Sequence, residues 1–176
     1  MKMKAQIIGQ VFVYILAIVV VSIVLSFGYK AIKSFNLQQE QIAYVEMKNE
    51  MINLVKSKTV DFGSIEKKEI SVPVKYREVC FVKSISYGGL PNPSDSIFDK
   101  YPLIRKSIEF ELDGAEPKIK QNVFLIADTA EKPFGVGDIT LNQSRNKFMC
   151  LPVVNNKLRL RIEGMGKYAD ISGWTS

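Results

Sequence analysis

The sequence contains no histidine, and its only cysteines are Cys80 and Cys150. Histidine is the side chain that most often acts as a general base near neutral pH and as a zinc ligand, so neither role is available here. The two cysteines are far apart in the chain and do not have the close spacing of a metal-binding motif. The sequence therefore predicts no zinc site and no histidine-dependent catalysis.

Motifs of catalysis are also missing. The chain has no nucleophile motif and no glycine-rich phosphate loop, and Gly135-Val136-Gly137 lacks the third glycine of a dinucleotide-binding turn. We therefore expect no catalytic residues, no cofactor, no metal and no small-molecule substrate. A protein without these features is expected not to be an enzyme.

Net positive charge is small outside the N-terminal region. The formal net charge is +6, but Lys2 and Lys4 precede a long apolar segment and Lys30 and Lys33 follow it closely. The remainder of the chain is nearly balanced in charge. Because nucleic-acid binding requires a basic surface, we expect no nucleic-acid partner.

Charged residues are absent from Gln6 to Tyr29, a stretch that follows a short basic leader, residues 1–5. A helix rises about 1.5 Å per residue, so residues 6–29 are long enough to cross a hydrocarbon core of about 30 Å. The segment predicts a single-pass transmembrane helix. The expected location is the cell membrane, with the lipid bilayer as a partner.

The apolar segment contains polar residues at Gln10, Tyr14, Ser22 and Ser26. In hydrocarbon, the amide of Gln10 and the hydroxyl of Tyr14 need hydrogen-bond partners, which neighbouring helices can provide. Ser22 and Ser26 are four residues apart, a spacing that allows close approach of helices, although serine is also tolerated in an isolated membrane helix. We interpret the four as candidate packing residues of a homo- or hetero-oligomer.

Neither proline nor glycine occurs from Ala31 to Lys58. Apolar residues recur there at three-, four- and seven-residue intervals, at Ala31, Phe35, Ile42, Val45, Ile52 and Val55. This spacing predicts that the helix continues through residues 30–60 as an amphipathic extension. Packing against the following domain explains the stripe better than a coiled coil, because the heptad pattern is short and is interrupted by polar residues.

The residues around Lys4-Ala5-Gln6 resemble the processing site of type IV prepilins, particularly those of archaeal pilin-like proteins. In that family a peptidase cuts between a short basic leader and the apolar helix, and the helix then packs in the core of a filament. The resemblance implies cleavage between Ala5 and Gln6. Gln6 matches the glutamine that archaeal members often have at the first mature position. Archaeal members often have serine at the position of Ile8 and usually have glutamate at the position of Gln10. The neutral Gln10 is more compatible with a minor or divergent subunit.

The resemblance implies a non-enzymatic surface protein, either a pilin-like subunit or a minor component of a type IV filament or secretion assembly. Residues 64–176 would then lie outside the cytoplasm. One alternative is an unprocessed single-pass membrane protein whose extracytoplasmic β-rich domain has a binding or accessory role. Another is a secretory signal cleaved near Ser26 and Gly28, but the apolar core is longer than the ~7–15 residues usual for a signal peptide.

From about residue 64 the periodicity changes from helical to alternating. Apolar residues alternate with charged ones in residues 108–112 and 158–162, which predicts strands with one buried face. Further strands are expected at residues 69–74, 79–85, 121–127 and 147–154. Asn155-Asn156 suits a two-residue hairpin turn, since asparagine tolerates positive φ. The prediction is an α+β fold, a long N-terminal helix followed by a mostly antiparallel β-sheet or sandwich of about six to eight strands.

Cys80 and Cys150 both fall in strands that are expected to be central. If the domain is extracytoplasmic, the two could form a disulfide, which would stabilise the fold by about 4 kcal/mol on a chain-entropy estimate. Otherwise they are free cysteines that pack as small apolar residues. Asn142-Gln143-Ser144 is a glycosylation sequon in an expected loop, and Asn142 is therefore a candidate glycosylation site.

Overall fold

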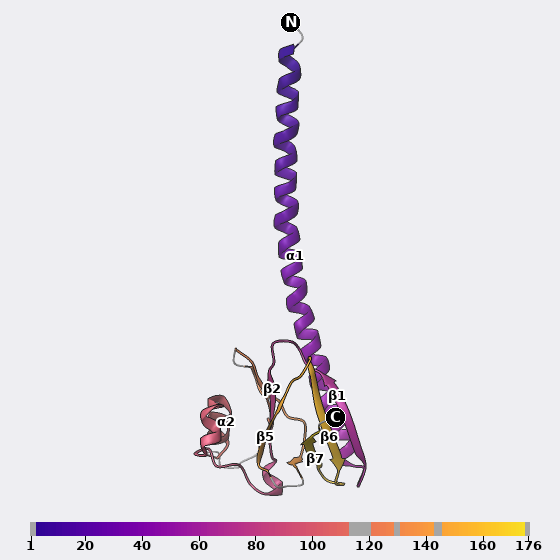
Figure 1. Ribbon diagram of the computed structural model, residues 1–176, viewed down its shortest axis with the longest axis vertical. Helices are drawn as coiled ribbons and strands as arrows, with labels where there is room; N and C mark the ends of the chain where they lie inside the picture. Colours follow the sequence, from indigo (N-terminus) through magenta and orange to yellow (C-terminus); the bar gives the residue numbers. More distant parts are fainter. Residues whose placement is uncertain (1–2, 113–120, 129–130, 143–145, 175–176) are drawn as a thin grey trace. The chain divides into compact units, whose positions relative to one another are not determined.

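The computed structural model describes residues 3–112, 121–128, 131–142 and 146–174, without the side chains of residues 3–10, 37, 111 and 112. The chain divides into two units, residues 1–42 and residues 43–176. Helix α1 (Met3–Thr59) begins in the first unit and ends in the second, where it is followed by two β-sheets (Figure 1). The predicted α+β class is therefore confirmed.

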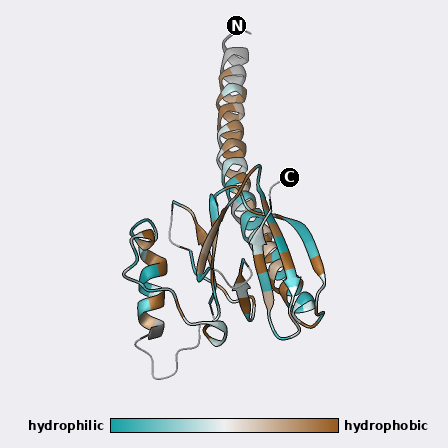
Figure 2. Cartoon of the chain, turned by 60° about the horizontal axis from the view of Figure 1, so that its bottom comes forward, coloured by the Kyte–Doolittle hydropathy of each residue, from teal (hydrophilic) through white to brown (hydrophobic). Residues whose placement is uncertain are grey.

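The first unit consists of the N-terminal part of α1, which is hydrophobic along most of its length (Figure 2). From Val11 to Leu25 its residues are almost all apolar, and their side chains are exposed. Because this part of the sequence has no charged residues, the helix is apolar on all of its sides. Among the described residues, one helix is long and apolar enough to cross a membrane by length and composition. The structure is thus compatible with membrane anchoring.

The second unit contains two sheets. The strands of sheet A follow the order β1 (Ile65–Ser71), β6 (Lys157–Gly164), β7 (Ala169–Gly173) and β4 (Ile139–Leu141). The strands of sheet B follow the order β3 (Val123–Ile126), β2 (Glu78–Val82) and β5 (Phe148–Pro152). All pairs are antiparallel except β4 with β7.

The last turns of α1 and the inner faces of both sheets share the larger apolar core. Met47, Met51 and Val55 are buried at helical spacing, and the predicted packing of this part of α1 against the domain is confirmed. The buried residues of the helix are not those of the expected stripe, because Ile42 and Val45 are exposed. Methionine fills the buried positions instead, as its flexible side chain suits irregular gaps.

Strand β2 is buried on both faces, as its uninterrupted apolar sequence predicts. Val79 and Phe81 pack in the core shared with α1, whereas Cys80 and Val82 face a second, smaller core. Because side chains alternate between faces in a strand, one short strand can connect two cores.

Residues 108–112 were expected to form a strand, and this prediction is wrong. They belong to helix α2 (Pro102–Leu112), which begins with proline at a position where no amide donor is needed. Tyr101, Ile104 and Ile108 are buried at helical spacing in the smaller core, whereas Phe110 is 80% exposed. Apolar and acidic residues alternate at the end of α2, but here this alternation occurs in a helix and does not indicate a strand.

The predicted hairpin turn at Asn155-Asn156 is confirmed. Both residues have positive φ, 52° and 58°, as a type I′ turn requires. The flanking Val154 and Lys157 exchange two backbone hydrogen bonds of 3.0 Å. The turn joins β5 of sheet B to β6 of sheet A, so it links the two sheets.

Candidate functional site

The candidate residues lie in two places, the apolar helix α1 and the strands that carry the two cysteines. In α1, the Ser22 hydroxyl donates a hydrogen bond of 2.8 Å to the carbonyl oxygen of Ile18, one turn earlier. Ser22 is therefore satisfied within its own helix and does not need a partner helix for hydrogen bonding. Tyr14 and Ser26 are exposed. The side chains of Tyr14 and Ser26 are therefore accessible to lipid or to another helix.

The expected processing site lies at the N-terminal end of α1. Ala5, Gln6 and Gln10 have helical backbone, and their side chains lie outside the described part of the chain. Asn142 lies just after β4, is exposed and has a φ of 48°. Gln143 and Ser144, which complete its sequon, lie outside the described residues.

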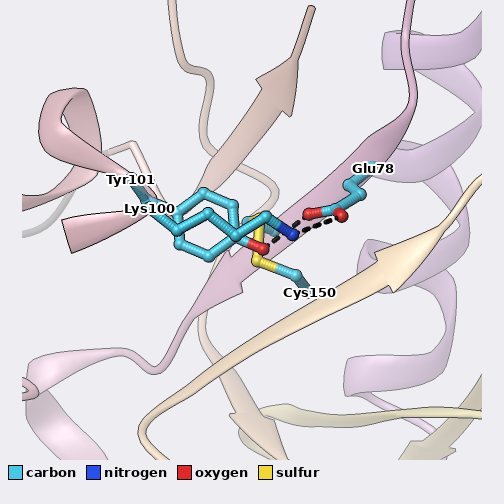
Figure 3. Close-up of a disulfide and its surroundings, with 5 residues drawn as sticks. Glu78, Lys100, Tyr101 and Cys150 are labelled. Carbon is cyan, nitrogen blue, oxygen red and sulfur yellow. Dashed lines mark hydrogen bonds and ion pairs between the residues drawn. A yellow bond between two sulfur atoms is a disulfide. The ribbon is translucent and has the colours of Figure 1, made fainter. Parts of the chain in front are cut away.

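The two cysteines form a disulfide between the two neighbouring strands β2 and β5 (Figure 3). Cys80 is fully buried and lies directly opposite Cys150, which is half-buried. The bond closes a loop with a sequence separation of 70 residues, and α2 lies within this loop. On the chain-entropy estimate, a loop of this length stabilises the fold by about 4 kcal/mol.

A small polar cluster lies beside the disulfide (Figure 3). Lys100 donates a hydrogen bond of 2.8 Å to Oε1 of Glu78, and the hydroxyl of Tyr101 donates one of 2.6 Å to Oε2. Lys100 and Tyr101 lie between the 3₁₀ helix η2 (Ser96–Asp99) and the body of α2, so the cluster joins the α2 layer to β2. Sequence reasoning did not find it, since its members are far apart in the chain.

The hydrogen bonds from Lys100 and then Tyr101 hold the pKa of the Glu78 carboxyl below its ordinary value. Burial, together with the negative Glu78, raises the pKa of the Tyr101 hydroxyl. Glu78 is therefore a carboxylate and Tyr101 a hydrogen-bond donor at neutral pH. The side chain of Glu78 is 26% exposed but that of Lys100 is 66% exposed, so solvent screens their ion pair and its contribution to stability is small.

Replacing Glu78 by glutamine is expected to lower the free energy of unfolding by about 1 kcal/mol at neutral pH, because the charge-assisted hydrogen bonds are lost. The pKa of Glu78 is lowered on folding, so its contribution is present above the unfolded value and is lost as the pH falls through the folded value. Urea denaturation at neutral pH and at about pH 3 measures this difference, which should shrink in acid. Glu109→Gln on the exposed face of α2 is the matched control, and an equal loss at both pH values for Glu78→Gln would contradict the assignment.

The same region also holds the described residues best placed to bind a metal. A carboxylate oxygen of Glu78 and the sulfur atoms of Cys80 and Cys150 lie within 4.8 Å of one another. While the sulfur atoms are bonded to each other, neither is a thiolate, which is the form that binds metal ions. The oxidised cluster is therefore a structural crosslink rather than a metal centre.

Comparisons with known proteins provide no family for this chain. No family model, no curated protein and no solved structure matches it significantly.

Proposed function

We propose that the protein is a non-enzymatic, membrane-anchored surface protein, and specifically a pilin-like subunit of a type IV filament or secretion assembly. The observation that supports the membrane anchoring is the exposed apolar surface of α1 from Val11 to Leu25, and the prepilin-like residues around Ala5 and Gln6 support the pilin-like identity. Exposed apolar area costs about 25 cal/mol per Å² in water, so a helix of this kind is stable only in lipid or against other helices. Such a helix would anchor the folded second unit at the membrane.

Polar residues within the apolar segment support assembly over an isolated helix. Tyr14 is exposed within the apolar segment, and in the hydrocarbon of a bilayer its hydroxyl would need a hydrogen-bond partner. Ser22 does not add to this argument, because its own helix satisfies it. The proposed partners are therefore other copies of this helix or related helices, which contact the segment around Gln10 and Tyr14.

The disulfide supports a location outside the cytoplasm for the second unit. Disulfides form and persist in oxidising compartments and are rare where thiols are kept reduced. A bond between Cys80 and Cys150 therefore fits a domain that is exported across the membrane while α1 remains within it. The resemblance of the N-terminus to prepilins leads to the same orientation.

The mature protein is expected to begin at Gln6, because the prepilin-like leader would be removed after Ala5. Mass spectrometry of the N-terminal peptide from protein purified out of native membranes measures this directly. A peptide that retains Met1 would contradict the pilin-like proposal and favour an unprocessed single-pass protein. A peptide that starts near Tyr29 would instead identify a secretory signal and contradict both membrane-anchored forms.

The unprocessed single-pass protein is the second candidate, and Gln10 favours it. In prepilin-like proteins the usual residue at this position is glutamate, whose charge can pair with the new N-terminal amine of a neighbouring subunit. A neutral amide accepts a hydrogen bond but cannot neutralise an ammonium group in a medium of low dielectric constant. In this alternative, the second unit is an extracytoplasmic binding or accessory domain held at the membrane.

A further inference from the structure

Sheet B brings together, from two strands, three side chains of the types that can bind metal ions. Glu78 and Cys80 are two residues apart on β2 and therefore lie on the same face, and Cys150 is opposite Cys80 on β5. Their donor atoms lie within 4.8 Å of one another (Figure 3). Because the two cysteines are far apart in the chain, the sequence shows no metal-binding spacing.

We propose that Glu78, Cys80 and Cys150 bind one Zn²⁺ ion when the disulfide is reduced. Two thiolates and a carboxylate are a donor set that suits Zn²⁺, with a water molecule as the fourth ligand. Zn–S bonds of about 2.3 Å place the two sulfur atoms of a tetrahedral site about 3.8 Å apart. Once the covalent bond is broken, small rotations of the two cysteine side chains bring the donors to that spacing.

The chemistry balances as a reduction followed by a ligand exchange. A phosphine supplies two electrons to the disulfide and breaks the sulfur–sulfur bond; its phosphorus takes the oxygen of a water molecule to become a phosphine oxide, and the two protons of that water complete the thiols of Cys80 and Cys150. Zn²⁺ then displaces both thiol protons, which pass to solvent, and the two sulfur atoms bind it as thiolates. Glu78 contributes its existing carboxylate and loses no proton.

The neighbours of Glu78 are arranged to support the bound ion. Two thiolates and one carboxylate carry one more negative charge than Zn²⁺ neutralises, and the ammonium of Lys100, 2.8 Å from Oε1, balances it. The hydroxyl of Tyr101 holds the other carboxylate oxygen at 2.6 Å. Each oxygen retains a lone pair for the metal, and such outer hydrogen bonds orient a metal ligand.

The metal would preserve the crosslink that reduction removes. The sulfur–zinc–sulfur bridge joins β2 to β5 and closes the same 70-residue separation as the disulfide. The smaller core, in which Cys80 packs with residues of α2, would therefore stay attached to sheet B in both redox states. The three residues thus act as a disulfide under oxidising conditions and as a zinc site under reducing ones.

Cobalt binding to the full chain in detergent micelles tests the proposal, because Co²⁺ substitutes for Zn²⁺ and reports thiolate ligands by its absorption. The protein is reduced with a phosphine without oxygen, separated from the reductant and titrated with Co²⁺, then with Zn²⁺. We expect thiolate-to-cobalt charge-transfer absorption that saturates at one ion per chain in the reduced protein and is absent in the oxidised protein. Zn²⁺ should displace the cobalt. It should also raise the Tm of the reduced protein but not that of the oxidised protein.

Two variants separate a built site from simple thiol binding. Glu78→Gln is expected to weaken cobalt binding roughly tenfold or more, since it removes a charged ligand. Glu69→Gln, which removes a carboxylate that pairs with Arg159 at 2.9 Å on sheet A, should leave the affinity unchanged. Circular dichroism of every sample shows whether it is folded. Equal binding by Glu78→Gln, no charge-transfer absorption in the folded reduced chain, or unfolding on reduction would each overturn the proposal.

Discussion

Arginines in place of Ile18 and Val21 are expected to move the protein out of the membrane fraction. Both side chains lie in the exposed apolar part of α1, near the middle of the charge-free segment. An arginine at the centre of a membrane helix costs about 2.5–3.5 kcal/mol on insertion scales, so the pair costs about 6 kcal/mol. That is a loss of more than a thousandfold in the equilibrium for insertion, which leaves the second unit without an anchor.

Separation of membranes from soluble protein, followed by alkaline extraction, measures the effect. The matched control is Gln38→Arg with Gln41→Arg, which places the same charges at the same spacing on exposed positions of α1 beyond the charge-free segment. This control should remain in the extracted membranes, as the unchanged protein does. Retention of the Ile18→Arg, Val21→Arg variant in the membrane after alkaline extraction would contradict the assignment of the anchor.

Phe81→Ala is expected to lower the free energy of unfolding of the second unit by about 3–5 kcal/mol. Phe81 is 1% exposed and lies on the face of β2 that packs in the core shared with α1. Its removal leaves a cavity between sheet B and its neighbours, because the paired strands on both sides of β2 prevent collapse. Since domains are typically stable by about 5–15 kcal/mol, this is a large share of the total.

Urea denaturation of the full chain, monitored by the fluorescence of Trp174, measures this loss of free energy of unfolding. Phe110→Ala is the matched control, since Phe110 is 80% exposed on α2 and its truncation should change the free energy of unfolding by less than about 0.5 kcal/mol. Similar losses for the two variants would mean that Phe81 does not occupy the core described here.

The sequence predicts those elements whose patterns have a single structural explanation. The charge-free segment and the lack of proline and glycine from Ala31 to Lys58 both favour a long helix, and α1 ends at Thr59. Leu158, Leu160 and Ile162 alternate with charged residues along β6, and all three are buried. Along β6 the local pattern and the burial agree, so no tertiary information is needed. In α1 the pattern predicts the helix but not which of its side chains are buried, since Ile42 and Val45 are exposed.

Helix α2 could not be predicted in this way, because its sequence fits two periodicities. Ile108 and Phe110 suggest a strand face, whereas Ile104 and Ile108 suggest a helix face. Only the smaller core decides between them, since Ile104 and Ile108 are buried there while Phe110 is exposed. Strands β4 and β7 were also missed, because β4 is short and β7 contains a buried aspartate, Asp170, that accepts a hydrogen bond from the hydroxyl of Thr140 in β4.

The candidate site depends on register, which the sequence does not supply. The Asn155-Asn156 turn fixes β5 relative to β6, but nothing local fixes β5 relative to β2. The pairing of Cys80 with Cys150 and the approach of Glu78 to both sulfur atoms therefore emerge only from the folded sheet. Lys100 and Tyr101 join them through the position of α2, the element that sequence reasoning assigned incorrectly.

Protease treatment of intact cells tests the proposal that the apolar helix anchors the β domain outside the cytoplasm. A protease added outside the cells is expected to remove a C-terminal epitope tag from the full chain while a cytoplasmic marker remains intact. The apolar segment of α1 is expected to stay with the membrane after the cut. Protection of the tag until the cells are lysed would contradict this orientation.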